Sequence, residues 1–186
     1  MTPSLRQAVI RVSLFFAGVL TLPAIVLVLG FAGALPFNAL SAPPSWEQSL
    51  GQSFLRASVA SQAKGLVDPI DPKSEADMMA GLHNFRNECA GCHGDYGKPS
   101  LWGTMALYPR APQFADYHPP LTPAEMYVVV RNGVRYTAMG ANPERPGATP
   151  AKIAAHTRAY WQMVTFIDHM NDLPPAVDAE WKHPHQ

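Results

Sequence analysis

A stretch of 24 residues without a charged side chain, Val12 to Leu35, limits what the N-terminal part of this chain can form. As an α-helix it would extend about 36 Å, which is enough to cross the hydrocarbon core of a membrane. A lone membrane span must satisfy its backbone hydrogen bonds within itself, so it has to be helical, and a proline such as Pro23 is tolerated there. The sequence therefore predicts a cytoplasmic N-terminus and a transmembrane anchor over residues 1–35.

Basic residues lie on one side of this stretch. Arg6 and Arg11 precede it, and the next basic residue is Arg56. The positive-inside rule then places the N-terminus in the cytoplasm and the rest of the chain outside. A cleaved signal peptide is the alternative, although its apolar core normally has only about 7–15 residues. In both cases we expect export, and we predict a single-pass protein of the bacterial inner (cytoplasmic) membrane with its main domain in the periplasm.

The most specific motif in the chain is Cys89-Ala90-Gly91-Cys92-His93, which contains its only two cysteines. A Cys-x-x-Cys-His pattern is typical of covalent attachment of a c-type haem. The two thiols lie about one helical turn apart, so both can reach the vinyl groups of one porphyrin while the histidine binds the iron. We therefore expect one haem c, attached through Cys89 and Cys92, with His93 as an axial ligand.

Other uses of such a cysteine pair fit this sequence less well. A thioredoxin-like redox pair follows a strand, whereas a helical pattern precedes Cys89. A structural zinc site needs four ligands, and the chain has no second cysteine pair. The formal net charge of zero also gives no general attraction for nucleic acid.

Hydrophobic spacing and capping residues predict an all-α protein whose loops are rich in its 19 prolines. We expect helices over about 46–63, from 73 or 74 into the cysteine motif, over 123–132 between Thr122 and Gly133, and over 151–173. The stretches 100–120 and 134–150 should be irregular. The predicted organisation is an anchor (1–35), a linker with a juxtamembrane helix (36–74), a haem domain (75–175) and a C-terminal tail (176–186).

The helix expected over residues 46–63 has two interpretations. Ser45 with Gln48 suggests a capping box at its start. Its apolar residues can pack on the main domain, or they can dock on the bilayer or on a partner protein, and Trp46 near the membrane exit is typical of an interfacial anchor. The sequence leaves both interpretations open.

A haem that only transfers electrons usually has a second protein ligand, and methionine opposite histidine raises its potential. Most of the eight methionines lie in expected helices, where packing is their ordinary role. Met139 instead follows a helix stop, in a loop 46 residues after His93. We therefore predict Met139 as the second iron ligand, with Met105 and His118 as alternatives.

Together these residues resemble the class I (mitochondrial-type) cytochromes c over Glu75 to Pro175. That family has a glycine and an aromatic residue eight and four positions before the first cysteine, as Gly81 and Phe85 are here, where its first and last helices cross closely. The Met139 loop and the final helix, with Trp161 and Phe166, are also similar. The resemblance implies an all-α fold of three to four helices around one haem.

The family likeness also suggests further residues around the haem. In that family a proline carbonyl accepts the second N–H of the proximal histidine, the kind of bond that orients a metal ligand. Pro109 and Pro112 are the candidates, and Pro112 is preferred. Arg110 and Trp102 are candidates for hydrogen bonds to the haem propionates.

The expected function is that of a membrane-anchored monohaem c-type cytochrome, which carries single electrons between membrane redox complexes. Its partners would be the membrane and redox proteins, with no small-molecule substrate and no enzymatic activity. One alternative is a fixed haem subunit of a larger respiratory or photosynthetic complex. Another is a haem enzyme or gas sensor with an open distal site.

Overall fold

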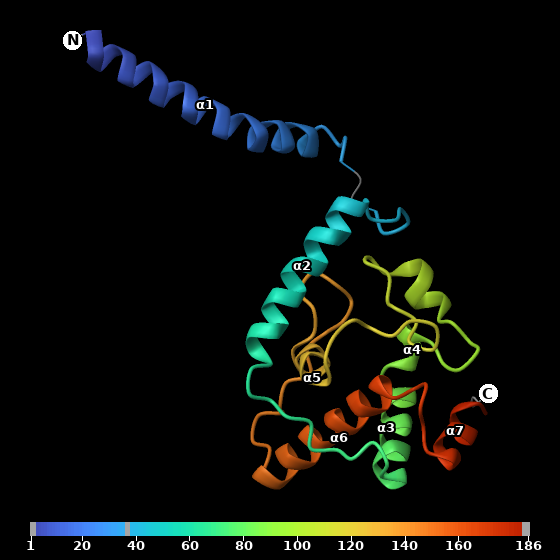
Figure 1. Ribbon diagram of the computed structural model, residues 1–186. Coiled ribbons are helices and arrows are strands. Elements are labelled where there is room, and N and C mark those ends of the chain that lie inside the picture. Colours follow the sequence, from blue (N-terminus) through green and yellow to red (C-terminus); the bar gives the residue numbers. More distant parts are fainter. Residues whose placement is uncertain (1–2, 36–37, 184–186) are drawn as a thin grey trace. The chain divides into compact units, whose positions relative to one another are not determined.

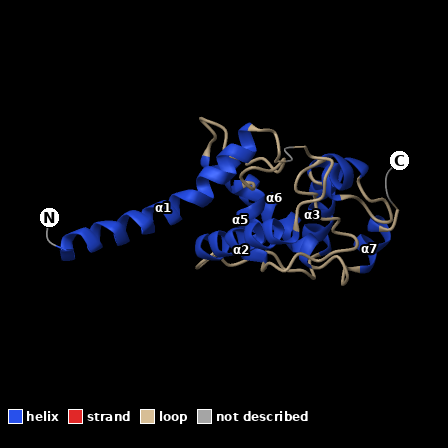
Figure 2. Ribbon diagram, turned by 90° about the horizontal axis from the view of Figure 1, so that it is seen from above, coloured by secondary structure: helices blue, strands red, loops and turns tan. Residues whose placement is uncertain are grey.

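The computed structural model describes residues 3–35 and 38–183, which contain eight helical segments and no strand (Figures 1 and 2). The prediction of an all-helical protein is confirmed at this level. The chain divides into two compact units, Met1–Ser41 and Ala42–Gln186. The first unit contains a single helix, and the second contains the hydrophobic core.

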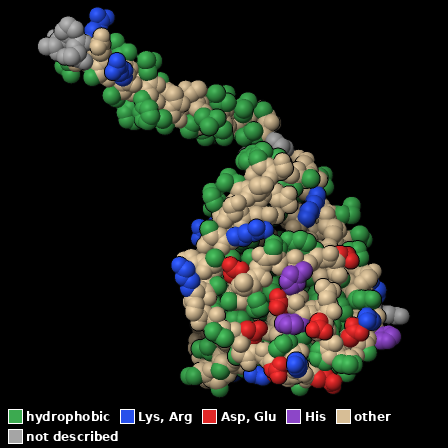
Figure 3. Space-filling view, in the orientation of Figure 1, with side chains coloured by type: hydrophobic (Ala, Val, Ile, Leu, Met, Phe, Trp, Pro, Cys, Tyr) green, Lys and Arg blue, Asp and Glu red, His purple; other side chains and the backbone are tan. Residues whose placement is uncertain are grey.

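Helix α1 (Pro3–Phe31) confirms the predicted long apolar helix, and its Leu5–Phe31 part is long and apolar enough to cross a membrane. Hydrophobic side chains cover it, with basic side chains at its N-terminal end (Figure 3). It ends before Leu35, earlier than expected, because Gly33 adopts a left-handed φ of 70°. The Ala34 N–H then bonds the Leu29 carbonyl oxygen at 2.9 Å, which closes the helix as in a Schellman motif.

Helix α2 (Ser45–Gln62) lies within one residue of its predicted bounds. The predicted capping box is wrong, because Ser45 is already inside the helix. Pro44 is the capping residue, with an extended ψ of 149° and no side-chain cap. The second half of α2 packs on the main domain, where Val59 and Ala63 contact Val128 in a small apolar cluster.

The main core forms where helix α3 (Glu75–Glu88) crosses helix α6 (Pro150–Asp168). Gly81 allows this crossing, because a Cβ there would overlap the backbone carbonyl of Gln162 on α6. Next to it, the fully buried rings of Phe85 and Phe166 lie 5.7 Å apart. The absence of a side chain at Gly81 therefore allows α3 and α6 to pack this closely.

Helix α5 (Pro123–Asn132) packs on α6 and begins with a capping box between Thr122 and Glu125. Its Tyr127 ring stacks on Trp161 of α6, with centroids 4.2 Å apart and planes 9° apart. The helix stops at Gly133, which has a φ of 66°. The sequence prediction for this helix and for both of its ends is confirmed.

The helices at the C-terminal end differ from those that the sequence predicts. The expected helix over 151–173 ends at Asp168, and a further helix, α7 (Pro175–Trp181), follows where a tail was expected. Trp181 is only 3% exposed and lies edge-on to Phe85 at 5.9 Å. Burial of this indole holds the described part of the tail, up to residue 183, against the core.

Candidate functional site

The cysteine motif forms one short helical turn directly after α3. The backbone bends at Cys89 (φ −117°, ψ −35°), and helix α4 (Ala90–His93) follows it. The amides of Cys92 and His93 both bond the Cys89 carbonyl oxygen, at 3.0 and 2.9 Å. Gly94 ends the turn with a φ of 78°. Both cysteines are unpaired and partly buried.

The Cys89 thiol has an apolar environment. It packs against the main core, and its Sγ lies 3.2 Å from Met163 Sδ. Burial raises the pKa of the Cys89 thiol to about 12, and the negative charge of Glu88 acts in the same direction. A nucleophilic thiol of a disulfide oxidoreductase has a lowered pKa instead. The environment of Cys89 therefore does not resemble that of a redox-catalytic cysteine.

The His93 ring has a fixed orientation. Its Nδ1 lies 2.8 Å from the Pro112 carbonyl oxygen, and its face stacks on Phe114 with centroids 4.4 Å apart and planes 5° apart. A carbonyl oxygen can only accept, so Nδ1–H donates and the lone pair of a neutral ring remains on Nε2. Burial lowers the pKa of His93, and the bond to Pro112 opposes this effect.

Three backbone carbonyls of the motif accept hydrogen bonds from residues further along the chain. Ser100 Oγ donates to Gly91 at 2.6 Å, Gln113 Nε2 donates to Cys92 at 3.1 Å, and the Phe114 amide donates to His93 at 3.2 Å. Gln113 Oε1 also accepts from the Ser100 amide at 2.7 Å. We call Ser100, Gln113 and Phe114 the carbonyl clamp. Sequence reasoning missed these residues, because nothing in their spacing marks them.

The stretch 100–120, expected to be irregular, contains a π-helical turn, η1 (Trp102–Ala106). Gly103 on this turn lies directly against the motif, since a Cβ there would overlap the Cys92 carbonyl oxygen. The Ala111 amide bonds the Gly103 carbonyl oxygen at 3.0 Å. A glycine inside a proline-rich loop was the only sequence signal for this close approach.

Trp102 and Arg110, the two candidates for hydrogen bonds to the haem propionates, lie on or beside this turn. Trp102 is 63% exposed. The Arg110 guanidinium donates to the carbonyl oxygens of Met105 and Leu107. Arg110 therefore braces the backbone of η1 in this structure.

Met139 is partly buried and packs against the same core cluster as Cys89. Its loop is closed by local bonds, from the Val134 amide to the Met139 carbonyl oxygen at 2.9 Å and from the Met139 amide to Thr137 Oγ1 at 3.0 Å. At Gly133, a Cβ would lie 2.6 Å from the Gly140 carbonyl oxygen.

Met105 and His118, the two alternative iron ligands, differ from Met139 in their environments. Met105 is 63% exposed on η1. His118 Nε2 lies 3.6 Å from Asp168 Oδ1. Four of the other methionines lie in the core, as expected for packing residues: Met78, Met126, Met163 and Met170.

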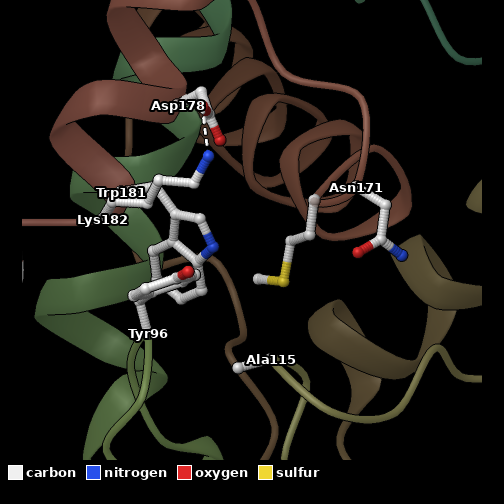
Figure 4. Close-up of a pocket in the computed structure, with 7 residues that line it drawn as sticks. Tyr96, Ala115, Asn171, Asp178, Trp181 and Lys182 are labelled. Carbon is white, nitrogen blue, oxygen red and sulfur yellow. Dashed lines mark hydrogen bonds and ion pairs between the residues drawn. The ribbon is translucent and has the colours of Figure 1, made fainter.

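A recess of about 180 Å³ lies beside α7, lined by Tyr96, Ala115, Met170, Asn171, Asp178, Trp181 and Lys182 (Figure 4). Lys182 Nζ bonds Asp178 Oδ2 at 2.6 Å across its upper side. It contains none of the residues that the sequence predicts for the site. The recess is therefore a separate feature of the C-terminal end.

Within the described residues, no group of three or more His, Cys, Asp or Glu side chains is placed to hold a metal ion. The residues that could hold a cofactor here are two unpaired thiols and one oriented imidazole, which share one helical turn. Comparison of the chain with protein-family models, with curated proteins and with solved structures found no match. What the site can do is therefore inferred from its own side chains.

Proposed function

We propose that this protein is a membrane-anchored monohaem c-type cytochrome that carries single electrons between membrane redox complexes. The His93 ring carries the proposal. Its Nδ1 is bonded to Pro112 and its Nε2 is left for a metal, directly after two unpaired cysteines one helical turn apart. An outer bond of this kind sets the tautomer and direction of a metal-ligating histidine.

The residues present fit a covalently attached haem. Cys89 and Cys92 would hold the porphyrin through thioether bonds, and His93 and Met139 would bind its iron. When bound, the haem supplies an iron that alternates between ferric and ferrous states. The chain's part is to orient His93 through Pro112 and Phe114 and to exclude water with the apolar core that Cys89 and Met139 border.

The α3–α6 crossing supports the class I cytochrome c fold as part of this proposal. The family resemblance implies a close helix crossing at a glycine beside an aromatic residue. Gly81 and Phe85 lie at such a crossing, with Phe85 buried against Phe166. This likeness is independent of the cysteine motif, because it depends on packing and not on haem chemistry.

The proposed location is the bacterial inner membrane, with the haem domain on the periplasmic side. The support is one apolar N-terminal helix, α1, with Arg6 and Arg11 near its beginning. A signal sequence has a similar composition, so the state of the mature N-terminus tests the anchor. An intact mass of the membrane-extracted protein that includes α1 is the expected result.

Covalent haem is tested by producing the chain in a bacterium that attaches c-type haem in the periplasm. We expect a mass increase of one haem that survives denaturation, and none in the double variant Cys89→Ser/Cys92→Ser. A single-cysteine variant, Cys92→Ser, should retain at most one thioether bond. Wild-type chain that folds in the membrane without any covalent haem would refute the proposal.

The second ligand separates an electron carrier from an open-site enzyme or sensor. We expect a long-wavelength ferric absorption band, typical of methionine–iron ligation, which disappears in Met139→Ala. The matched control Met105→Ala should retain it, since Met105 is exposed on η1. Ready binding of carbon monoxide to the unmodified ferrous protein would instead favour the open site.

Redox partners would approach the apolar surface of η1. Leu101, Trp102 and Met105 are 73%, 63% and 63% exposed there, and Gly103 of the same turn touches the Cys92 backbone. Gentle solubilisation separates the two forms of the proposal. A free monomer indicates a mobile carrier, and a stable assembly that dissociates in Leu101→Ser/Met105→Ser indicates a fixed subunit.

A further inference from the structure

Helix α2 has apolar side chains on two opposite faces. On the inner face, Val59 and Ala63 are 3% and 9% exposed and pack towards α5, with Leu55 beside them. On the opposite face lie Trp46, Leu50 and Phe54, which are 67%, 47% and 67% exposed. We call these three residues the outer stripe of α2. An ordinary amphipathic helix has only one apolar face.

The outer stripe carries no charge. Its members are four residues apart and therefore follow one side of the helix. The residues that share this side by helical spacing are Ser53, Ala57 and Ser61, which are small and neutral. The nearest acidic side chain, Glu47, accepts a hydrogen bond from Tyr108 Oη at 2.8 Å and is thereby tied to the main domain.

The covalent chain sets an upper limit on the distance between the outer stripe and the apolar helix α1. Thirteen residues separate the end of α1 at Phe31 from the start of α2 at Ser45. Fully extended, they reach no further than about 45 Å. A bilayer crossed by α1 is therefore present at high effective concentration around α2. Trp46, the member of the stripe closest to α1 in sequence, is the residue type enriched at membrane interfaces.

We propose that the outer stripe of α2 docks in the interfacial layer of the same bilayer that α1 crosses. A second copy of the chain is a poorer occupant. A stable protein interface buries about 800 Å² on each partner. An aromatic side chain covers at most about 150–250 Å², and Trp46, Leu50 and Phe54 are only partly exposed, so they fall short of that area. The stripe also lacks the charged side chains that orient protein partners and exclude wrong ones. This inference rests on α1 in the membrane and not on haem.

The test uses the full chain in lipid vesicles that contain a phospholipid with a photoreactive diazirine near the glycerol end of its acyl chain. After illumination, mass spectrometry maps the lipid adducts. We expect adducts on α1 and at Trp46, Leu50 and Phe54. In the variant Leu50→Glu/Phe54→Glu, the lipid adducts on α2 should be at least tenfold fewer than in the wild type, and those on α1 should remain. Its melting temperature should stay unchanged, because both side chains are exposed.

The matched control is Leu101→Glu/Met105→Glu, which places the same charges on the exposed apolar surface of η1. This variant should retain the α2 adducts. Labelled α1 with unlabelled α2 would overturn the inference, as would unchanged α2 adducts in Leu50→Glu/Phe54→Glu or cross-links between the α2 helices of two copies. Adducts do not depend on haem, so failure here is distinguishable from failure of the proposed function.

Discussion

The two predicted axial ligands, His93 and Met139, are held in different ways. His93 is oriented by Pro112 and Phe114, about twenty residues further along the chain, and its helical turn is secured by the carbonyl clamp. Met139 is held by bonds within its own loop, to Val134 and Thr137. The difference teaches that hydrogen bonds from distant residues secure the turn of His93, whereas the hydrogen bonds that shape the Met139 loop come from the loop itself.

This comparison leads to separate expectations for the two sides. Changes that disturb packing around α4 should lower global stability and haem attachment together. Changes within the Met139 loop should affect iron ligation while most of the stability remains, because local loops open at lower free energy than cores do. Three variants test the comparison, and a fourth in the α3–α6 frame gives a reference outside both sides; they follow from the largest expected effect to the smallest.

The largest effect is expected for Gly103→Ala. The added Cβ would overlap the Cys92 carbonyl oxygen and lie 3.2 Å from Ala111 Cβ. Overpacking of this kind should lower the free energy of unfolding by about 3 kcal/mol, and the yield of covalent haem should fall with it. Denaturant unfolding measures the first effect, and a haem-stained denaturing gel measures the second. Gly91→Ala is the control, since a Cβ at Gly91 meets nothing within 4 Å. Equal stability of the two variants would contradict the close approach.

Gln113→Ala should have the next largest effect. It removes the donor to the Cys92 carbonyl oxygen and the acceptor for the Ser100 amide, leaving partly buried backbone groups unpaired. The expected loss is about 2 kcal/mol, measured by denaturant unfolding of the haem-loaded protein. The exposed Gln52 on α2 provides the control, because Gln52→Ala should change stability by less than about 0.5 kcal/mol. A loss as small as that of the control would rule out the clamp.

On the Met139 side, Thr137→Val should lower stability by only about 1 kcal/mol. Thr137 Oγ1 donates to the Val134 carbonyl oxygen at 2.8 Å and accepts from the Met139 amide, and valine can do neither. Covalent haem should remain complete while the long-wavelength ferric band weakens. The measurement compares the amount of covalent haem with the intensity of this band in the same sample. Loss of haem attachment in this variant would show that the two sides are not independent.

The smallest effect concerns Asp77, which belongs to the α3–α6 frame and to neither side. Hydrogen bonds from Gln162, Ser74 and Arg158, led by Gln162, lower the pKa of Asp77 from its ordinary value of 3.8. The carboxylate therefore adds stability above that value, and this contribution is lost as the pH falls through the lowered pKa. Between pH 6 and pH 3, Asp77→Asn should flatten the acid-induced loss of stability by about 0.5 kcal/mol.

Thermal unfolding over this pH range measures the contribution of Asp77. Asp172, on an exposed stretch after α6, serves as the control position, and Asp172→Asn should leave the pH profile unchanged. Iron ligation by His93 and Met139 should be unaffected in the two variants. A pH profile of Asp77→Asn identical to that of the wild type would refute the contribution.

Sequence reasoning predicted the parts of the fold whose causes are local. The uncharged apolar stretch predicted α1, and Thr122 with Gly133 predicted both ends of α5, because capping and helix termination depend on neighbouring residues. Gly81 was expected at a close helix crossing from the family resemblance, and it lies at one. The capping box at Ser45 failed because Pro44 takes the capping position.

The parts that sequence reasoning missed depend on distant contacts. Nothing within residues 100–114 marks Gln113 as the partner of Cys92, and the tail beyond residue 175 shows no sign that Trp181 is buried against Phe85. Side chains of these types are common on surfaces as well as in cores. Their roles depend on which backbone lies opposite them, which is a property of the folded chain.

The sequence by itself determined that a long apolar helix lies near the N-terminus, that the other regular elements are helical, and that two cysteines and a histidine share one turn. Charge, capping and spacing act over a few residues and can be read in order along the chain. Only the tertiary structure decided that Phe114 stacks on His93, that Gln113 and Ser100 secure the turn, and that α2 presents a second, uncovered apolar face. Those outcomes depend on close packing between segments that are distant in sequence.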